Sequence, residues 1–241
     1  MFIFGVNFTL YYQALKGGIK SIFRDEEFRF YLGTVLASIA LITFNILGAN
    51  FDTFWESLRH ASFQVSSIIT TTGYSTTDFN LWPVFSKTIL VVLMFVGACA
   101  GSTAGGIKCV RFVLLFKTIK HEILKIIHPR SVYTVKYGGK TIDDDTLAGV
   151  WTYLFSYIVI FTIALLIVSL DGMDMVTTFT SVATTIGNVG PGLEVCGPYG
   201  SFSGFSNLSK IIFSFVMLFG RLEIFPMLII FTPTFWKKVN I

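Results

Sequence analysis

Two short segments that are rich in threonine and end in glycine carry residue types suited to ion chemistry. They read SIITTTG over residues 67–73 and SVATTIG over residues 181–187, and four of the seven positions are identical at an offset of 114 residues. A cation that enters a membrane must exchange water for fixed oxygens, which a stretched backbone with inward carbonyls supplies, and glycine permits the dihedral angles needed. The pattern predicts a site for a desolvated monovalent cation. A polar cap between two packed helices is the plainer alternative.

The surroundings of both segments indicate re-entrant loops. Residues 61–77 carry no charge but have ten Ser, Thr or Gln side chains among seventeen residues. Such groups are poorly matched to lipid, so protein or water must surround them. Acidic loops flank the segment on one side of the membrane, and residues 175–193 repeat the arrangement. The predicted unit is therefore a helix, a half-length dip and a second helix, present twice.

Composition and hydropathy place these units in a membrane. Of the 241 residues, 53% are hydrophobic and 13% are charged, and the mean hydropathy is +0.71. Each of three uncharged stretches is long enough to cross about 30 Å of hydrocarbon: residues 30–49, 88–107 and 146–170. A fourth stretch, residues 211–236, would qualify except for Arg221 and Glu223. The sequence predicts an all-α membrane protein and excludes a soluble one.

The basic residues predict the orientation. Fourteen of the eighteen Lys and Arg fall within residues 16–29, within residues 108–140 and at Lys237 with Lys238, and the loops between these places are acidic. The positive-inside bias puts the three basic segments in the cytoplasm, so the charge indicates topology rather than nucleic-acid binding. We predict a preceding helix end with its cytoplasmic loop at 1–27, one pore repeat at 28–140 and another at 141–241.

A run of small residues interrupts the second predicted span. Residues 97–106 read GACAGSTAGG. No strand precedes this run and no Lys-Ser or Lys-Thr follows its paired glycines, so it is not a phosphate-binding loop. Close helix packing and a break in the helix both remain open, because small residues permit each.

Arg221 is a guanidinium well inside a predicted span. Placing it there costs at least about 2.5 kcal/mol, so it should face the interior of the bundle or an aqueous pore. Glu223 is only two residues away and points elsewhere on a helix, so it is not the obvious partner. A gating role and a purely structural bond to loop carbonyls are both open.

Four motifs in order give the chain a family resemblance: TTTGYSTTDFNLWP at 70–83, GACAGSTAGGIK at 97–108, TTIGNVGPG at 184–192 and FGRLEIFP at 219–226. Together with FRDEEFRFY before the first full span, they resemble the third and fourth repeats of the TrkH/KtrB potassium transporters. The resemblance implies a potassium-channel-like fold in which four helix, pore-loop and helix repeats surround one ion path. This chain would be the C-terminal half, with a broken second helix in its first full repeat.

The resemblance also implies site residues. It places potassium at two filter strands, residues 70–75 and 184–189, whose members are Thr71, Thr72, Gly73, Tyr74, Thr185, Ile186, Gly187 and Asn188. Ser75 and Val189 stand where channels have a second glycine, so a less discriminating filter is expected. The gate would consist of Gly101, Ser102, Gly105, Gly106 and Arg221. No other metal, no cofactor and no catalytic residue is expected.

The implied function is potassium uptake across a bacterial inner membrane by half of a four-repeat subunit, and not an enzymatic activity. The missing N-terminal repeats or a second copy would complete the pore. A cytosolic nucleotide-binding regulatory subunit of the TrkA/KtrA type would dock on residues 108–140, and lipids would surround the helices. Two alternatives stay open: a non-conducting assembly or receptor subunit, and a conduit for sodium or another monovalent cation.

Overall fold

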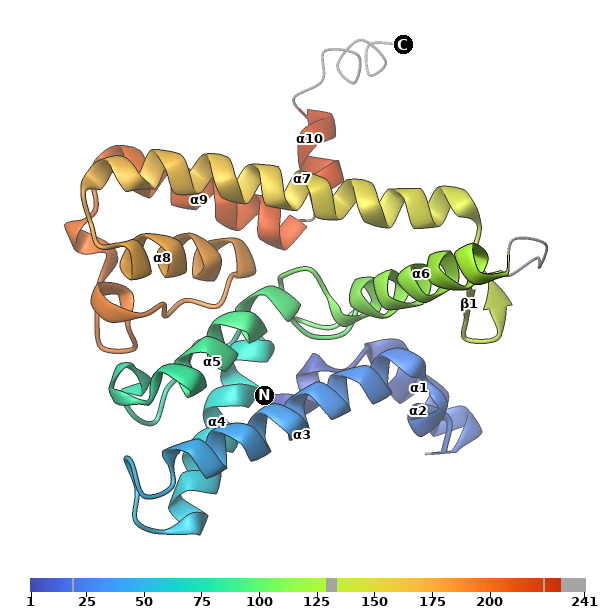
Figure 1. The fold of residues 1–241 in the computed structure, drawn as a ribbon, viewed down its shortest axis with the longest axis horizontal. Helices are drawn as coiled ribbons and strands as arrows, with labels where there is room; N and C mark the ends of the chain where they lie inside the picture. Colours follow the sequence, from blue (N-terminus) through green and yellow to red (C-terminus); the bar gives the residue numbers. More distant parts are fainter. Residues whose placement is uncertain (19, 129–133, 223, 231–241) are drawn as a thin grey trace.

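The computed structural model describes residues 1–18, 20–128, 134–222 and 224–230. Glu223 and the predicted cytoplasmic pair Lys237 and Lys238 lie outside these residues. The described chain is mainly helical, and its main body consists of two units of similar design. Figure 1 shows the first unit in blue to green and the second, in yellow to red, packed above it.

The first unit begins with α3 (Glu26–Ile46), whose N-terminus is capped by the Asp25 carboxylate accepting the Phe28 N–H at 2.8 Å. The half-length helix α4 (Phe54–Ile69) turns back against α3. After the short helix η2 (Phe79–Leu81), the inner helix is divided into α5 (Val84–Val96) and α6 (Cys109–Ile127). The predicted break in the second helix of this repeat is therefore confirmed.

The second unit repeats this order without the break. Helix α7 (Asp144–Val168) continues through η3 (Ser169–Asp171), and α8 (Met175–Gly187) is the half-length helix. Helices η4 (Glu194–Cys196) and η5 (Phe202–Gly204) lead to α9 (Asn207–Leu222), and α10 (Ile224–Ile230) follows. Both units turn at the same end of the molecule, the left end in Figure 1, as re-entrant loops require.

Smaller elements precede and join the two units. They are η1 (Phe2–Gly5), α1 (Phe8–Gly17), α2 (Lys20–Arg24) and a hairpin of β1 (Lys136–Tyr137) with β2 (Lys140–Thr141). The hairpin strands pair antiparallel, with Lys136 opposite Thr141. It lies at the end of the molecule away from the re-entrant loops, the right end in Figure 1.

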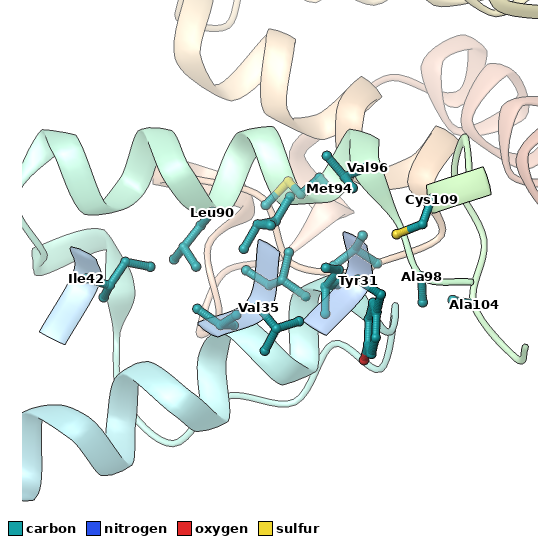
Figure 2. Close-up of a cluster of buried hydrophobic side chains, with 14 of the residues drawn as sticks. Tyr31, Val35, Ile42, Leu90, Met94, Val96, Ala98, Ala104 and Cys109 are labelled. Carbon is teal, nitrogen blue, oxygen red and sulfur yellow. The ribbon is translucent and has the colours of Figure 1, made fainter. Parts of the chain in front are cut away.

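Two of the described helices are long and apolar enough to cross a membrane by length and composition: α3, and α7 with η3. Helix α5 is apolar but shorter, because the break ends it at Val96. In Figure 2, Tyr31 and Val35 of α3 lie beside Leu90 and Met94 of α5 in the core of the first unit. Between lipid-facing helices such contacts stabilise through close packing, because lipid is as apolar as the core.

Candidate functional site

The end of α4 turns into an extended segment under the control of one serine. Thr71 has a left-handed backbone conformation, with φ of 53°, and Gly73 has φ of 80°. The N–H of Thr72 donates to the Ser67 carbonyl at 2.8 Å, and the Ser67 hydroxyl donates to the Tyr74 carbonyl at 2.5 Å. One residue of the half-helix thus fixes the chain that leaves it.

The end of α8 has the same hydrogen-bond pattern around a threonine. Asn188 is left-handed with φ of 56°, and Gly190 has φ of 113°. The N–H of Val189 donates to the Thr184 carbonyl at 2.9 Å, and the Thr184 hydroxyl donates to the Pro191 carbonyl at 3.1 Å. The same hydroxyl accepts the Gly190 N–H at 2.9 Å. Two half-helices therefore end in matching turns.

These matches correct the predicted register of the repeat. Ser67 and Thr184 are 117 residues apart, three more than the offset that aligns the two threonine motifs. Thr71 therefore corresponds to Asn188, and Gly73 corresponds to Gly190. The prediction that Gly187 is the counterpart of Gly73 is wrong, because Gly187 is still helical and is the last residue of α8.

The corrected offset also removes Thr185 and Ile186 from the predicted filter strand. Thr185 and Ile186 lie in the last turn of α8 and are buried, so they do not form the extended strand that was predicted. The Thr185 hydroxyl is within hydrogen-bond distance of the carbonyls of Ser181 and Val182, at 2.8 and 3.0 Å. The extended segment of the second unit starts after Asn188.

Gly187 serves close packing. A Cβ on Gly187 would lie 2.7 Å from the Met94 carbonyl oxygen, at the end of α5. A Cβ on Gly105 would lie 2.8 Å from the carbonyl oxygen of Gly187. Gly187 therefore allows the inner helix of the first unit and the loop after it to approach α8.

The two extended segments adjoin and border one cavity of about 310 Å³. A Cβ on Gly73 would lie 2.3 Å from the Val189 carbonyl oxygen, so the segments touch at this glycine. The cavity lining combines four threonines, an asparagine and a glycine with three residues that have apolar side chains: Thr71, Thr72, Thr184, Thr185, Asn188, Val189, Gly190, Phe202 and Met217. Predicted filter residue Tyr74 has an exposed side chain, 69% accessible, and its carbonyl is bonded to Ser67. The hydroxyl, amide and carbonyl oxygens around this cavity offer a cation several neutral ligands at short range.

The glycine-rich break forms a loop that runs from Gly97 to Lys108, which we call the intramembrane loop. Left-handed glycines occur at its start, middle and end, with φ of 67° at Gly97, 68° at Gly101 and 82° at Gly106. The loop meets the first extended segment through the Gly105 N–H, which lies 3.2 Å from the Thr71 hydroxyl oxygen. Gly105 thus contacts the turns of both units.

The other predicted gate residues of the loop face different neighbours. A Cβ on Gly101 would lie 3.1 Å from the Asn7 side-chain oxygen, in the N-terminal segment. The Ser102 hydroxyl donates to the Cys99 carbonyl at 2.5 Å, within the loop. Gly106 packs on the end of α5 and on Gly97. Of the predicted loop residues, Gly105 is the one that the structure brings to the extended segments.

Arg221 reaches the intramembrane loop from the second unit. It lies in the last turn of α9, and its Nη1 donates to the Thr103 carbonyl. The next residue back, Gly220, allows α9 to touch α8, because a Cβ there would lie 1.8 Å from the Ile186 carbonyl oxygen. The Asn188 amide also donates to the Met217 carbonyl of α9 at 2.9 Å. Arg221, the intramembrane loop and the turn after α8 therefore form one connected site.

Sequence reasoning missed Ser67 and Thr184, the residues whose hydroxyls hold the extended segments. The sequence does contain a signal for this offset of 117 residues: the dipeptide Thr-Gly at 72–73 aligns with the dipeptide Val-Gly at 189–190. It also missed the N-terminal segment, where Gly5 accepts the Cys99 N–H at 3.0 Å and the Phe8 N–H donates to Gly101 at 3.2 Å.

Two packed units of helix, half-helix and helix, with paired extended turns, define a helical membrane protein with pore-loop repeats. Comparison with known families agrees: the TrkH family, described as cation transport protein, matches residues 5–238. The chain belongs to this family.

Individual relatives match almost the whole chain. The Trk system potassium uptake protein TrkH of Salmonella typhimurium is 37% identical over 240 residues, which are 99% of this chain and 49% of that protein. TrkG of Escherichia coli K12, another Trk system potassium uptake protein, is 36% identical over 233 residues. The crystal structure of the potassium transporter TrkH from Vibrio parahaemolyticus superimposes with a TM-score of 0.88 at 37% identity, covering 98% of this chain and 51% of that one. The chain thus spans about half the length of these relatives.

Proposed function

We propose that the chain forms half of a potassium-uptake pore in a bacterial inner membrane. The observation that carries the proposal is the matched pair of turns, in which Ser67 and Thr184 hold equivalent extended segments beside one cavity that several threonines line. The relatives named above are potassium uptake proteins, which supports potassium as the transported ion and a transport role rather than an enzymatic one.

The proposed filter consists of residues 71–73 and 188–190. Backbone carbonyls of both segments would replace part of the hydration shell of the ion. The C-terminal ends of α4 and α8 point their partial negative charge at the same place, which favours a cation and opposes an anion. Side chains contribute hydroxyls at Thr71 and Thr72 and an amide at Asn188.

The proposed gate is the intramembrane loop together with Arg221. The loop lies against the filter turns through Gly105, and Arg221 bonds to its Thr103 carbonyl. In this position the loop obstructs the inner side of the filter, and the guanidinium charge raises the barrier for cations that rest there. Conduction then requires the loop to move, which its left-handed glycines permit.

Two repeats do not encircle an ion, so the working pore needs further repeats, supplied by N-terminal repeats or by a second copy of this chain. Conduction is proposed for that assembly. On the inner face, residues 108–140 carry an exposed basic and apolar surface on α6, including exposed Ile123 and Ile126, which suits a cytosolic nucleotide-binding regulatory subunit. The proposed orientation puts the filter turns towards the outside.

Potassium-dependent growth tests the function. The chain is expressed in a bacterium that lacks potassium uptake, alone and together with a separately supplied N-terminal half of the TrkH type. Growth at low potassium in either arm supports a conduit, and the arm that grows identifies what completes the pore. Membrane insertion without growth in both arms supports a non-conducting assembly subunit instead. Uptake that sodium supports equally well would favour the sodium conduit.

A further inference from the structure

A buried carboxylate lies where the first unit meets the intramembrane loop. Glu27, in the first turn of α3, is only 2% exposed. Its Oε1 accepts the N–H of Ala100 at 2.6 Å and the N–H of Val110 at 2.9 Å. Ala100 belongs to the loop and Val110 to the beginning of α6. One oxygen atom therefore bonds to both sides of the helix break.

The bond to Val110 is of a kind that stabilises a helix terminus. The first N–H groups of an α-helix have no partner within the helix, and the partial positive charge there attracts an anion. Lys108, which precedes α6, has φ of 75° and no side-chain capping bond. Glu27 supplies an acceptor from another helix instead. Since a buried carboxylate without partners is costly, the two N–H bonds also explain how Glu27 stays buried.

The bond to Ala100 acts on the loop itself. Cys99, the preceding residue, is bonded through its N–H to Gly5, so this arm of the loop is held by α3 and by the N-terminal segment. Figure 2 shows Ala98, Ala104 and Cys109 next to Tyr31, one turn along α3 from Glu27. On the other arm, Thr103 is held by Arg221 of the second unit. A carboxyl group and a guanidinium from opposite units thus hold the two arms of the loop.

We propose that Glu27 is a positioning residue that keeps the intramembrane loop under the filter. Its bond to Val110 anchors the carboxylate to α6, while its bond to Ala100 must break before the loop leaves the ion path. The inference rests on the proposed gating role of the loop and adds a second holding point to it. Glu27 touches no filter residue in the described structure and sets loop position, not ion selectivity.

Two substitutions test this role against a neighbouring control. Glu27→Ala removes both bonds, and Glu27→Gln keeps an acceptor but replaces the carboxyl group by an amide, which cannot make charge-assisted bonds. Glu26→Gln is the control, because Glu26 pairs with Lys117 and makes no hydrogen bond to the loop among the residues that the structure describes. We expect potassium leak through the closed assembly to rise about tenfold in Glu27→Ala, less in Glu27→Gln, and little in Glu26→Gln. Potassium over sodium selectivity and single-channel current should stay at the parent value in all three.

Hydrogen exchange gives a second readout that does not depend on conduction. Peptides covering residues 97–110 should exchange faster in Glu27→Ala than in the parent or in Glu26→Gln. Unchanged leak with unchanged exchange would overturn the proposal, as would a selectivity loss as large as the leak, or failure of both Glu27 variants to insert and assemble. If the parent assembly conducts no potassium, the proposed function fails, whereas faster exchange in Glu27→Ala would still support Glu27 as the holding point of the loop.

Discussion

The two repeats agree at the filter turn and differ below it. Ser67 and Thr184 make the same bonds to the chains that leave α4 and α8. In the first repeat the inner helix then breaks at Val96, whereas in the second it continues to Leu222. The unbroken helix carries Arg221 to the loop that the broken one provides. The duplication preserves the turns of the proposed filter, while the divergence supplies the loop of the proposed gate and the arginine that bonds to it.

The filter glycines give the sharpest test of this equivalence. Gly73→Ala and Gly190→Ala each place a side chain on a left-handed backbone, and at Gly73 the new Cβ also meets the Val189 carbonyl. Both should lower potassium over sodium selectivity about tenfold or more, because the strained residue turns carbonyls out of line. Rubidium and sodium uptake by the assembled pore measures this.

Gly187→Ala is the matched control for those two variants. Its Cβ meets the Met94 carbonyl, so it should reduce the amount of assembled protein but leave the selectivity of the assembled fraction unchanged. A selectivity loss in Gly187→Ala with none in Gly190→Ala would restore the register suggested by the threonine motifs.

The wrong alignment of Gly187 with Gly73 shows which structural features can be predicted from a sequence. The uncharged spans, the polar dips and the glycine-rich break follow from composition, because lipid penalises charge and unpaired backbone wherever they occur. The place where a half-helix ends does not follow in this way. Thr184 and Thr185 resemble Thr70 and Thr71, but α8 stays helical through Gly187, where its packing against Met94 requires a residue without a side chain.

Contacts between residues far apart in the chain could not be predicted from the sequence either, because they also depend on packing. Arg221 was identified from its cost in a membrane, but its partner Thr103 lies in another unit and offers only a backbone carbonyl, which every residue has. Glu27 was overlooked because it lies within residues 16–29, which were assigned to the cytoplasm from their basic residues. Which of the neighbouring carboxylates Asp25, Glu26 and Glu27 is buried depends on how the helices pack, and not on the local sequence.

Arg221 tests the divergence between the repeats. Arg221→Gln replaces the charged bond to Thr103 by a weaker neutral one, so we expect leak through the closed assembly to rise about 3- to 10-fold, the difference between a charged and a neutral hydrogen bond. Lys210→Gln is the control, because Lys210 lies on the same helix and bonds to Ser203 near its start, far along the chain from the loop. Equal leak in both variants would assign Arg221 a purely structural role.

The hydroxyls behind the filter should have a smaller effect. Thr184→Val keeps the shape of the side chain but loses its bonds to Gly190 and Pro191, and should cost about 1–3 kcal/mol of stability. Ser67→Ala loses one hydroxyl bond and should cost about half as much. Thermal unfolding of the assembly measures both, and Thr162→Val on α7 should change nothing. Recovery in Thr184→Ser is expected, and its absence would show that volume rather than the hydroxyl matters.

The smallest predicted effect concerns the link between the loops that follow the half-length helices of the two repeats. The Asn80 side chain donates to the Glu194 carbonyl at 3.1 Å and accepts the Glu194 N–H at 2.9 Å, so one amide bridges the units. Because these bonds are solvent-exposed, Asn80→Ala should lower the stability of the assembly by only about 1 kcal/mol. Asn50→Ala is the control: Asn50 bonds to Leu81 within the first unit and should leave the contact between units intact.

Asn80→Ala and Asn50→Ala are each combined with Thr184→Val, and a double-mutant cycle of the stabilities measures the coupling of each asparagine to the turn after α8. Coupling between Asn80 and Thr184 with none between Asn50 and Thr184 indicates that the filter turns depend on how the repeats are joined. Equal coupling for both asparagines would mean that each repeat sets its own turn.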